Sequence, residues 1–414
     1  MTIMESQIKH WCIEHQEKTI GPISSYALAL WGLQGLLYPN DIITRNGQRR
    51  FLAGYLPGMM PFIRNNGHLH RAKLWAVAGG KGGVGKSVFC ALVGVALSGL
   101  NKKVVIVDAD FGGPNQHDIF GIKSEPVSYW RHLDAHKSLN QLVKPTAFKN
   151  LSIIPGPEEA YDPKQAHIMR KIKMVQALRN MEADYVIMDL GPRTQSKDLD
   201  FFLTADMQVL LSTGEPTSLE NLSRVIKTLV LRKAQTAFNS LSRETFAQNF
   251  DETADSVSFI QNLTAQLRRL QLPADDIFKR VLSSFNIRVI FNMVESADYA
   301  KQSHLLNKYL SNELGLTFVV AGSIHHDPVV HEAMQNKDMQ RLTTYRSHAF
   351  QDILEITQKL MVTRTRTPES PEFRTVRPTA AINKQALICS KQCNLWDICE
   401  FKTPGNYCRV KNWN

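Results

Sequence analysis

Residues 79–87 read GGKGGVGKS, a stretch in which glycines and lysines are spaced for contact with a chain of phosphates. The pattern G-x-x-x-x-G-K-[ST] is complete from Gly80 to Ser87, and glycines in such a loop let successive backbone N–H groups turn toward phosphate oxygens. Lys86 is expected to reach the β- and γ-phosphates, and the Ser87 hydroxyl to bind Mg²⁺. The sequence thus predicts a nucleotide site, against the alternative of a glycine-rich turn without a ligand.

Two lysines lie in this stretch, although the phosphate-binding pattern uses only one. Lys81 follows the first glycine of the pattern, so it is either a solvent-facing charge or a residue with a function of its own. The residues expected to line the nucleotide are Gly80, Gly82, Gly83, Val84, Gly85, Lys86, Ser87 and Val88.

Carboxylates follow two other apolar stretches of the chain. Asp108 and Asp189 each close a hydrophobic run, where an unpaired carboxylate is costly. Contact with the Mg²⁺ shell would compensate this cost, and a structural salt bridge is the alternative. Asp110 and Asn292 also lie near the ends of such runs. Because ligands of open α/β sheets bind beyond the carboxyl ends of the strands, we expect these residues to meet at one edge.

Strands that position these residues are expected in the middle of the chain, where short β-branched runs alternate with longer helical patterns. Most of the runs are apolar on both faces, which is typical of the interior strands of a parallel sheet. The pattern predicts an α/β fold with a mostly parallel, doubly wound sheet. The expected strands are 74–78, 103–110, 151–156, 184–190, 208–213, 288–293 and 318–324.

Three motifs together resemble a known family. The stretches GGKGGVGKS, VVIVDADFGGPNQHDIFG and VIMDLGP look like those of the deviant Walker A ATPases of the MinD/ParA family, and most like its MinD/FlhG-like branch. The resemblance covers residues 72–362 and implies a P-loop NTPase domain that binds ATP with Mg²⁺. No N-K-x-D guanine signature is present, which agrees with ATP.

The resemblance also implies a role for each matching residue. Lys81 would reach the nucleotide of a second subunit, so that two monomers close face to face over two ATP molecules. Asp110 would orient or activate the attacking water, with Lys86 as the second catalytic lysine. The remaining implied roles are Mg²⁺ support by Ser87, Asp108 and Asp189, dimer contact by Asn115, adenine recognition by Asn292, and a position beside the base for Asp327 and Pro328.

Residues 1–65 form a separate small α+β unit that is similar to a GYF-type module. The similarity rests on a tryptophan, the turn at Gly21 and Pro22, a short helix and a later glycine turn before an aromatic residue. Such modules bind proline-containing peptides on an aromatic patch, for which Trp11, Trp31 and Phe51 are the candidates. The alternative is that these tryptophans form the core of so small a unit.

Two helical segments and a linker complete the predicted organisation. The segment 349–362 is amphipathic, and we expect it to pack on the sheet rather than insert into a membrane. A helical insertion is expected over about 235–285; its apolar stripe is either core or a partner-binding surface. Residues 363–385 read as a flexible linker. The stripe consists of Val257, Ile260, Leu263, Leu267 and Leu270.

The tail 386–414 carries four cysteines within 20 residues, Cys389, Cys393, Cys399 and Cys408, whereas Cys12 and Cys90 stand alone. Clustered thiols in a reducing compartment suit Zn²⁺ or an iron-sulfur cluster. Their spacing fits neither a zinc ribbon nor a ferredoxin pattern well, and unliganded thiols or disulfides remain alternatives. The cofactor of the tail is therefore left open between zinc and iron-sulfur.

The charge distribution and the hydropathy of the chain limit where the protein can be located and which partners it can bind. The net charge of +11 arises in the flanks, because residues 74–362 hold 32 Lys and Arg against 30 Asp and Glu. The flanks lack a dense basic tract, so contact with nucleic acid or an anionic membrane is unsupported, and a solvated surface is favoured. We expect a cytoplasmic protein, with the inner face of the membrane as an alternative site, because neither a signal peptide nor a membrane-spanning run is recognisable.

The function predicted from the sequence is that of a slow, partner-stimulated ATPase. ATP would drive dimerisation, and the dimer would position a flagellum, a division site or another polar structure through a partner or surface. The alternative is an iron-sulfur carrier or scaffold that resembles Mrp-type proteins, although the chain lacks their C-x-x-C pair. A third possibility is an adaptor that binds ATP without turnover, against which Asp110 argues.

Overall fold

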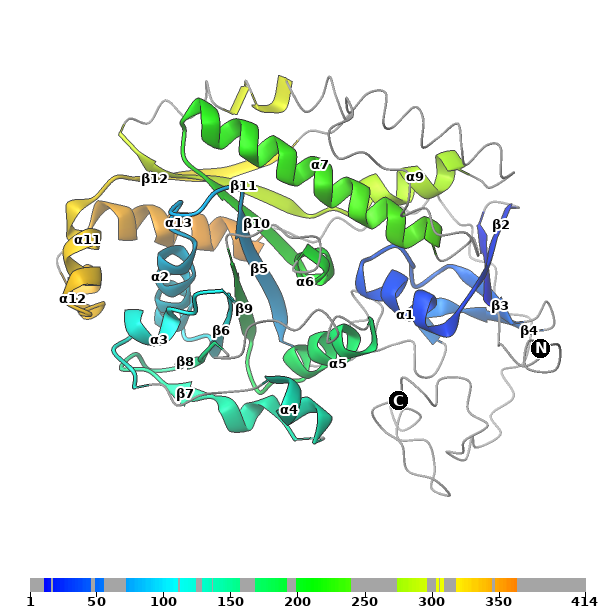
Figure 1. Cartoon of the computed structure of the whole chain (residues 1–414), viewed down its shortest axis with the longest axis horizontal. Coiled ribbons are helices and arrows are strands. Elements are labelled where there is room, and N and C mark those ends of the chain that lie inside the picture. The colour runs from blue at the N-terminus through cyan, green and yellow to red at the C-terminus, as the bar shows by residue number, and fades with distance from the viewer. Residues whose placement is uncertain are drawn as a thin grey trace.

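A computed structural model gives the structure of the chain, and the residues that it describes form two sheets (Figure 1). The larger has eight strands in the order β12-β11-β10-β5-β9-β6-β8-β7, and the smaller has four in the order β2-β1-β3-β4. The residues that the structure describes are 11–15, 18–45, 49–55, 72–110, 112–123, 129–135, 137–156, 168–191, 199–239, 274–295, 303–304, 306–308, 318–344 and 347–362.

The large sheet confirms the predicted α/β class. Its pairings are parallel except that β7 runs antiparallel to β8. All seven predicted strands are present, and the two-residue edge strand β7 was not predicted. The strands are β5 (Lys73–Gly79), β6 (Val104–Ala109), β7 (Lys144–Pro145), β8 (Leu151–Ile154), β9 (Tyr185–Leu190), β10 (Met207–Ser212), β11 (Ile287–Val294) and β12 (Val319–His325).

Helices cover both faces of this sheet, which explains why its strands are apolar throughout. Successive residues of β5 alternate between two cores: Ala76 and Ala78 face one, and Trp75 and Val77 face the other. The first core is covered by α4 (Tyr129–Asp134), α5 (Ile168–Arg179), α6 (Leu199–Thr204), α7 (Pro216–Asn239) and α9 (Ala274–Ser283). The second is covered by α2 (Lys86–Gly99), α3 (Gln116–Ile119), α11 (Pro328–Gln335), α12 (Gln340–Thr344) and α13 (His348–Val362).

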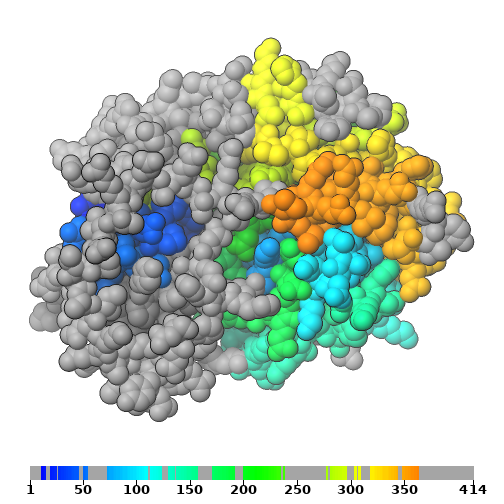
Figure 2. All heavy atoms as spheres, turned by 180° about the vertical axis from the view of Figure 1, so that it is seen from behind, coloured from blue at the N-terminus to red at the C-terminus, as the bar shows by residue number. Residues whose placement is uncertain are grey.

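Helix α13 packs on β12 and α2, as predicted for the segment 349–362. Its buried side chains include Ile353 and Ile356. A Cβ at Gly322 of β12 would lie 2.7 Å from Ile356 Cγ1, so this close packing requires a glycine there. Figure 2, which views the molecule from behind, shows α13 in orange at the surface on the right. No helix among the described residues is both long and apolar enough to cross a membrane.

The small sheet belongs to the N-terminal unit and is antiparallel throughout. Its elements are β1 (Trp11–His15), β2 (Lys18–Ile23), α1 (Ser25–Leu33), β3 (Ile42–Arg45), β4 (Arg49–Leu52) and the short 3₁₀ helix Ala53–Tyr55. Trp11 and Trp31 are fully buried, and Phe51 is partly buried against the same core. Of the two alternatives for these tryptophans, the structure supports the core, because both side chains fill the interior of the unit and neither lies on a surface patch.

The N-terminal unit shares a continuous apolar core with the first face of the large sheet, and α1 contacts α5 and α7 (Figure 1). A buried ion pair strengthens this contact. The guanidinium of Arg280 in α9 donates to both carboxylate oxygens of Asp41, over 2.7 and 2.8 Å, and to the carbonyl oxygen of Leu36 over 3.0 Å. The unit is thus packed firmly onto the helical layer.

Several predicted features lie outside the described residues. The predicted insertion over 235–285 is described only at its ends, where α7 and α9 are helical. The apolar stripe from Val257 to Leu270, the linker 363–385 and the tail 386–414 with Cys389, Cys393, Cys399 and Cys408 lie outside. These predictions remain untested.

Candidate functional site

The glycine-rich stretch forms the turn between β5 and α2, beyond the carboxyl end of β5. Gly83 and Gly85 have φ values of +76° and +84°, in the left-handed region that glycine adopts at little cost. A Cβ at Gly85 would lie 2.4 Å from the side-chain nitrogen of Asn292. Glycine at position 85 is therefore required both by the backbone conformation and by the space available.

The two lysines of the loop have opposite environments. Lys86 is 7% exposed at the start of α2, and burial lowers the pKa of its ammonium, an effect opposed by the nearby carboxylates of Asp189 and Asp110. Lys81 is exposed and makes no hydrogen bond or ion pair with any described residue. The buried lysine therefore faces the carboxylates of the site, while the other remains available for contact outside it.

Asp108 lies at the end of β6 and orders the loop that follows. Its side chain is fully buried and accepts backbone N–H groups from Asp110 (3.2 Å), Asn115 (2.8 Å) and Gln116 (2.9 Å). Burial and the neighbouring Asp189 raise the pKa of its carboxyl to about 7, while the three N–H groups act in the opposite direction. Both oxygens of Asp108 are thus engaged in holding the loop.

Asp189 lies at the end of β9, in register with Asp108 on β6. Its Oδ2 accepts a hydrogen bond from Gln116, while its Oδ1 has no hydrogen-bond partner among the described residues, although the side chain is buried. Burial raises the pKa of the Asp189 carboxyl, and Gln116, Ser87 and Lys86 oppose this shift. A buried carboxylate oxygen without a donor is suited to a hydrated Mg²⁺, which supplies both charge and donor groups.

Gln116 joins the three strand ends and was missed by the sequence analysis. Its buried side-chain nitrogen donates to Asp189 Oδ2 over 2.8 Å and to the carbonyl oxygen of Ser87 over 3.0 Å. Its backbone N–H donates to Asp108. No motif marks this residue, and its position directly after Asn115 in the loop following β6 is the sole hint in the sequence.

Asp110 is partly buried at the mouth of the site. Its Oδ1 accepts the N–H of Gly112 over 3.0 Å, and a Cβ at Gly191 would lie 2.6 Å from the same oxygen. The carboxylate of Asp110 therefore lies beside the end of β9, the strand that carries Asp189. Asn115, which directly precedes α3, has an exposed side chain on this same loop.

Asn292 belongs to the same edge, because its side-chain nitrogen donates to the carbonyl oxygen of Val84 over 2.9 Å. Asp327 and Pro328 start α11 beyond the end of β12. The carboxylate of Asp327 accepts hydrogen bonds from Val329, Ser347 and Ala349, so its described bonds tie it to α11 and α13 rather than to the phosphate loop. Contact of these residues with a base remains a prediction.

The two histidines next to Asp327 are not part of a metal-ligand cluster among the described residues. His325 pairs with Asp352 of α13 over 2.8 Å, and His326 is exposed. Within the described ranges, no group of three or more His, Cys, Asp or Glu side chains is arranged to hold a metal ion. This is compatible with Mg²⁺ at Ser87 and Asp189, since Mg²⁺ in nucleotide sites keeps several waters and takes one or two carboxylates together with phosphates.

Comparisons with known proteins agree with this geometry. A family model described as ParA: NUBPL iron-transfer P-loop NTPase matches residues 71–238. The chain is 30% identical over 157 residues to the septum site-determining protein MinD of Synechocystis sp., a match that covers 37% of this chain and 58% of that protein. It is 31% identical over 185 residues to an iron-sulfur cluster carrier protein of Rickettsia conorii, covering 37% of this chain and 54% of that protein.

A similar solved structure is the septum site-determining protein MinD complexed with Mg-ADP from Pyrococcus horikoshii, with a TM-score of 0.46 and 17% identity over 70% of this chain and 96% of that chain. The chain spans little more than half the length of the two curated relatives. The complete phosphate loop, the carboxylates at the adjacent strand ends and the family match together identify residues 71–238 as a P-loop NTPase segment of the ParA type, with MinD among its relatives.

Proposed function

We propose that this protein is an ATP-hydrolysing switch that dimerises with ATP and positions a cellular structure through a partner or a surface. The observation that carries the proposal is the contrast between two lysines of one loop. Lys86 is buried beside the carboxylates, whereas Lys81 is exposed and makes no bond with a described residue. A lysine held out from its own site is suited to the phosphates of a second subunit, where it would act as an arginine finger does in other NTPases.

The proposed roles within one site follow from the contacts above. Lys86 and the N–H groups of the loop would hold the phosphates, and Asp110 would orient the attacking water. Mg²⁺ bound at Ser87 and Asp189 would neutralise charge on the phosphate oxygens. Asp108 would keep the loop after β6 in place through its three backbone hydrogen bonds. Each role requires a group that the structure brings to this edge.

The proposed positioning role is supported by the relative named as septum site-determining. We expect the structure that is positioned to be a flagellum, a division site or another polar structure. We also expect the protein to act through a protein partner and to be located in the cytoplasm, including the inner face of the membrane. A partner that accelerates a slow hydrolysis would complete the switch. A proline-containing peptide at the N-terminal unit would have to bind without Trp11 and Trp31 as surface residues, because both are buried.

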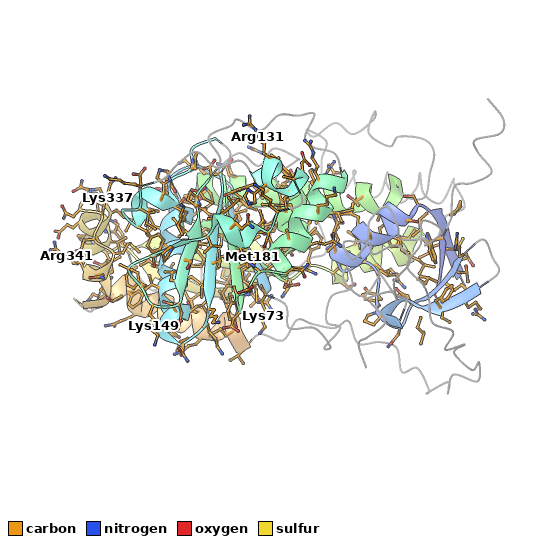
Figure 3. All side chains as sticks on the ribbon, turned by 90° about the horizontal axis from the view of Figure 1, so that it is seen from below. Lys73, Arg131, Lys149, Met181, Lys337 and Arg341 are labelled. Carbon is orange, nitrogen blue, oxygen red and sulfur yellow. The ribbon has the colours of Figure 1, made fainter. Side chains whose placement is uncertain are left out.

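The experiment that tests the switch is a comparison of Lys81→Ala with the wild-type chain. Sedimentation with ATP and Mg²⁺ should show a dimer for the wild type and a monomer for the variant, while nucleotide binding by the variant persists. Lys149→Ala is the matched control, because Lys149 is an exposed lysine outside the loop (Figure 3). A Lys81→Ala protein that still dimerises with ATP would contradict the proposal.

A second candidate function is favoured by the relative named as an iron-sulfur cluster carrier and by the iron-transfer description of the matching family model. In this case Cys389, Cys393, Cys399 and Cys408 would hold the cluster. The protein should then show an oxygen-sensitive visible absorption band that is lost when Cys389 and Cys393 are replaced. A colourless protein that holds stoichiometric zinc would exclude this function and leave the tail as a zinc site.

A further inference from the structure

The end of β11 is irregular beside the phosphate loop. Phe291 pairs with Ser323 of β12 and Val294 pairs with His325, so β11 contains one residue more than β12 between these two pairs. Met293 lies in this bulge with a φ of +57°. Bulges re-aim side chains and are frequent next to functional sites, so the direction of the Met293 side chain is a specific feature of this strand.

The left-handed conformation is costly for methionine. The other residues with positive φ besides glycine, among those described, are Asn101, Asn150 and Lys337. Asparagine tolerates this region because its short polar side chain bonds locally, whereas methionine gains no such bond. Met293 is also 44% exposed, although most of its strand is buried. An apolar side chain is thus held in a strained backbone conformation and turned toward solvent, which points to a ligand rather than to the core.

The side chain of Met293 reaches the phosphate loop. Its Cε lies 3.3 Å from the position that a Cβ at Gly85 would occupy, and the preceding Asn292 is bonded to the carbonyl oxygen of Val84. The thioether therefore borders the loop at the end where α2 begins. The N–H groups and Lys86 serve the phosphates, so an apolar group at this position matches a different part of a nucleotide.

We propose that Met293 is a specificity-determining residue that contacts the base of the bound nucleotide through its thioether. Methionine sulfur and methyl groups make favourable contacts with planar aromatic rings, and the unbranched side chain adapts to the ring. A phosphate chain offers no comparable partner to this group. The proposal rests on the proposed nucleotide site and adds to it a residue that helps the protein to distinguish a nucleotide from a bare chain of phosphates.

The test compares Met293→Gly, Met293→Asn and Met293→Leu in the full chain. Glycine and asparagine fit the left-handed backbone but remove the thioether, whereas leucine keeps an apolar side chain. The dissociation constants of ATP and of inorganic tripolyphosphate are measured calorimetrically with Mg²⁺, and the unfolding midpoint of each variant is recorded. Asn101→Gly is the control for the backbone, because Asn101 is left-handed just after α2, at the end remote from the phosphate loop.

We expect Met293→Gly and Met293→Asn to unfold at or above the wild-type midpoint and to bind ATP about threefold to tenfold more weakly. Their affinity for tripolyphosphate should equal that of the wild type, and Met293→Leu should bind ATP almost normally. An unchanged ATP affinity in the glycine variant, or an equal loss for ATP and tripolyphosphate, would overturn the proposal. A wild-type chain that binds neither probe would instead refute the nucleotide site itself.

Discussion

Asp108 and Asp189 are register partners on the adjacent parallel strands β6 and β9, and both carboxylates are buried. Burial disfavours the ionised form of each group, and the two negative charges repel each other. The pKa of Asp108 consequently rises from 3.8 to about 7, first through burial and then through Asp189. A divalent cation at this pair would relieve the repulsion, so the stability of the fold should depend on pH where no cation or nucleotide is present.

The first prediction concerns this pH dependence. Between pH values of about 4 and about 7, the folded chain keeps a proton on Asp108 that the unfolded chain has already lost. The contribution of Asp108 to the free energy of unfolding therefore falls as the pH rises through this window and is level above it. The test is urea unfolding in EDTA at several pH values. The free energy of unfolding of Asp108→Asn minus that of the wild type should increase as the pH rises from about 4 to about 7. An offset in this difference that is the same at every pH does not affect this test.

Asp118 supplies a control of opposite sign. Its exposed carboxylate has a lowered pKa, mainly because Lys337 donates a hydrogen bond to it. Its small stabilising effect is present above the ordinary pKa of aspartate and is lost as the pH falls through the lowered value. The free energy of unfolding of Asp118→Asn minus that of the wild type should therefore stay constant between pH values of about 4 and about 7. Equal slopes for the two variants would contradict the role given to Asp108.

The second prediction concerns Gln116. Leucine has a similar volume but no donor, so Gln116→Leu would leave Asp189 Oδ2 and the Ser87 carbonyl oxygen without this hydrogen bond. Groups that orient metal ligands typically change metal affinity by about tenfold or more when they are replaced. The Mg²⁺ concentration that gives half-maximal hydrolysis of ATP should rise about tenfold, while binding of ATP in EDTA stays near the wild-type value.

A second buried glutamine separates this effect from a general loss of stability. Gln208 is fully buried at the start of β10, at the opposite end of the sheet from the site, where its side chain donates to the carbonyl oxygens of Phe202 and Leu203 and accepts the N–H of Asn286. Gln208→Leu should lower the unfolding midpoint, because it removes these buried hydrogen bonds, without shifting the Mg²⁺ requirement. If Gln116→Leu lowered only the midpoint and kept the wild-type Mg²⁺ requirement, Gln116 would be a structural residue with no part in positioning Asp189.

The sheet could be predicted because its signals are local. Runs such as VVIVDA and YVIMDL are apolar on both faces, which leaves a buried parallel strand as their natural interpretation. Asp108, Asp189 and Asn292 could be placed at one edge because the carboxyl ends of parallel strands coincide. Strand β7 was missed because it has two residues, and its Pro145 is acceptable only at the edge of a sheet.

The remaining features depend on contacts between distant parts of the chain. Gln116 meets Asp189 across 73 positions, and a polar residue in a loop gives no local sign of such a contact. Arg280 and Asp41 are 239 positions apart in the sequence, so the packing of the N-terminal unit on the helical layer could not be predicted from local patterns. Trp31 illustrates a third limit, since a tryptophan suits both a core and a binding surface until its burial is known.

The third prediction concerns the ion pair between Asp41 and Arg280. Both side chains are about as buried as core residues, with 3% and 4% exposure. Removing one partner leaves the other charge buried and uncompensated, which costs about 3 to 5 kcal/mol. Asp41→Asn should lower the free energy of unfolding by an amount near this range. Asp41→Leu combined with Arg280→Met should cost less than either single change, because no buried charge remains.

The pair of Arg341 and Glu332 is the matched control. Its atoms lie 2.8 Å apart, but the side chains are 37% and 51% exposed, and Arg341 lies at the end of the molecule far from the N-terminal unit (Figure 3). Solvent screens such a pair, so Glu332→Gln should change the free energy of unfolding by less than about 1 kcal/mol. Urea unfolding of Asp41→Asn, the double variant, its two single variants and Glu332→Gln in one buffer makes the comparison. If Asp41→Asn were as mild as Glu332→Gln, the N-terminal unit would not be held to the helical layer by this ion pair, and its docking would have to rest on the shared apolar core alone.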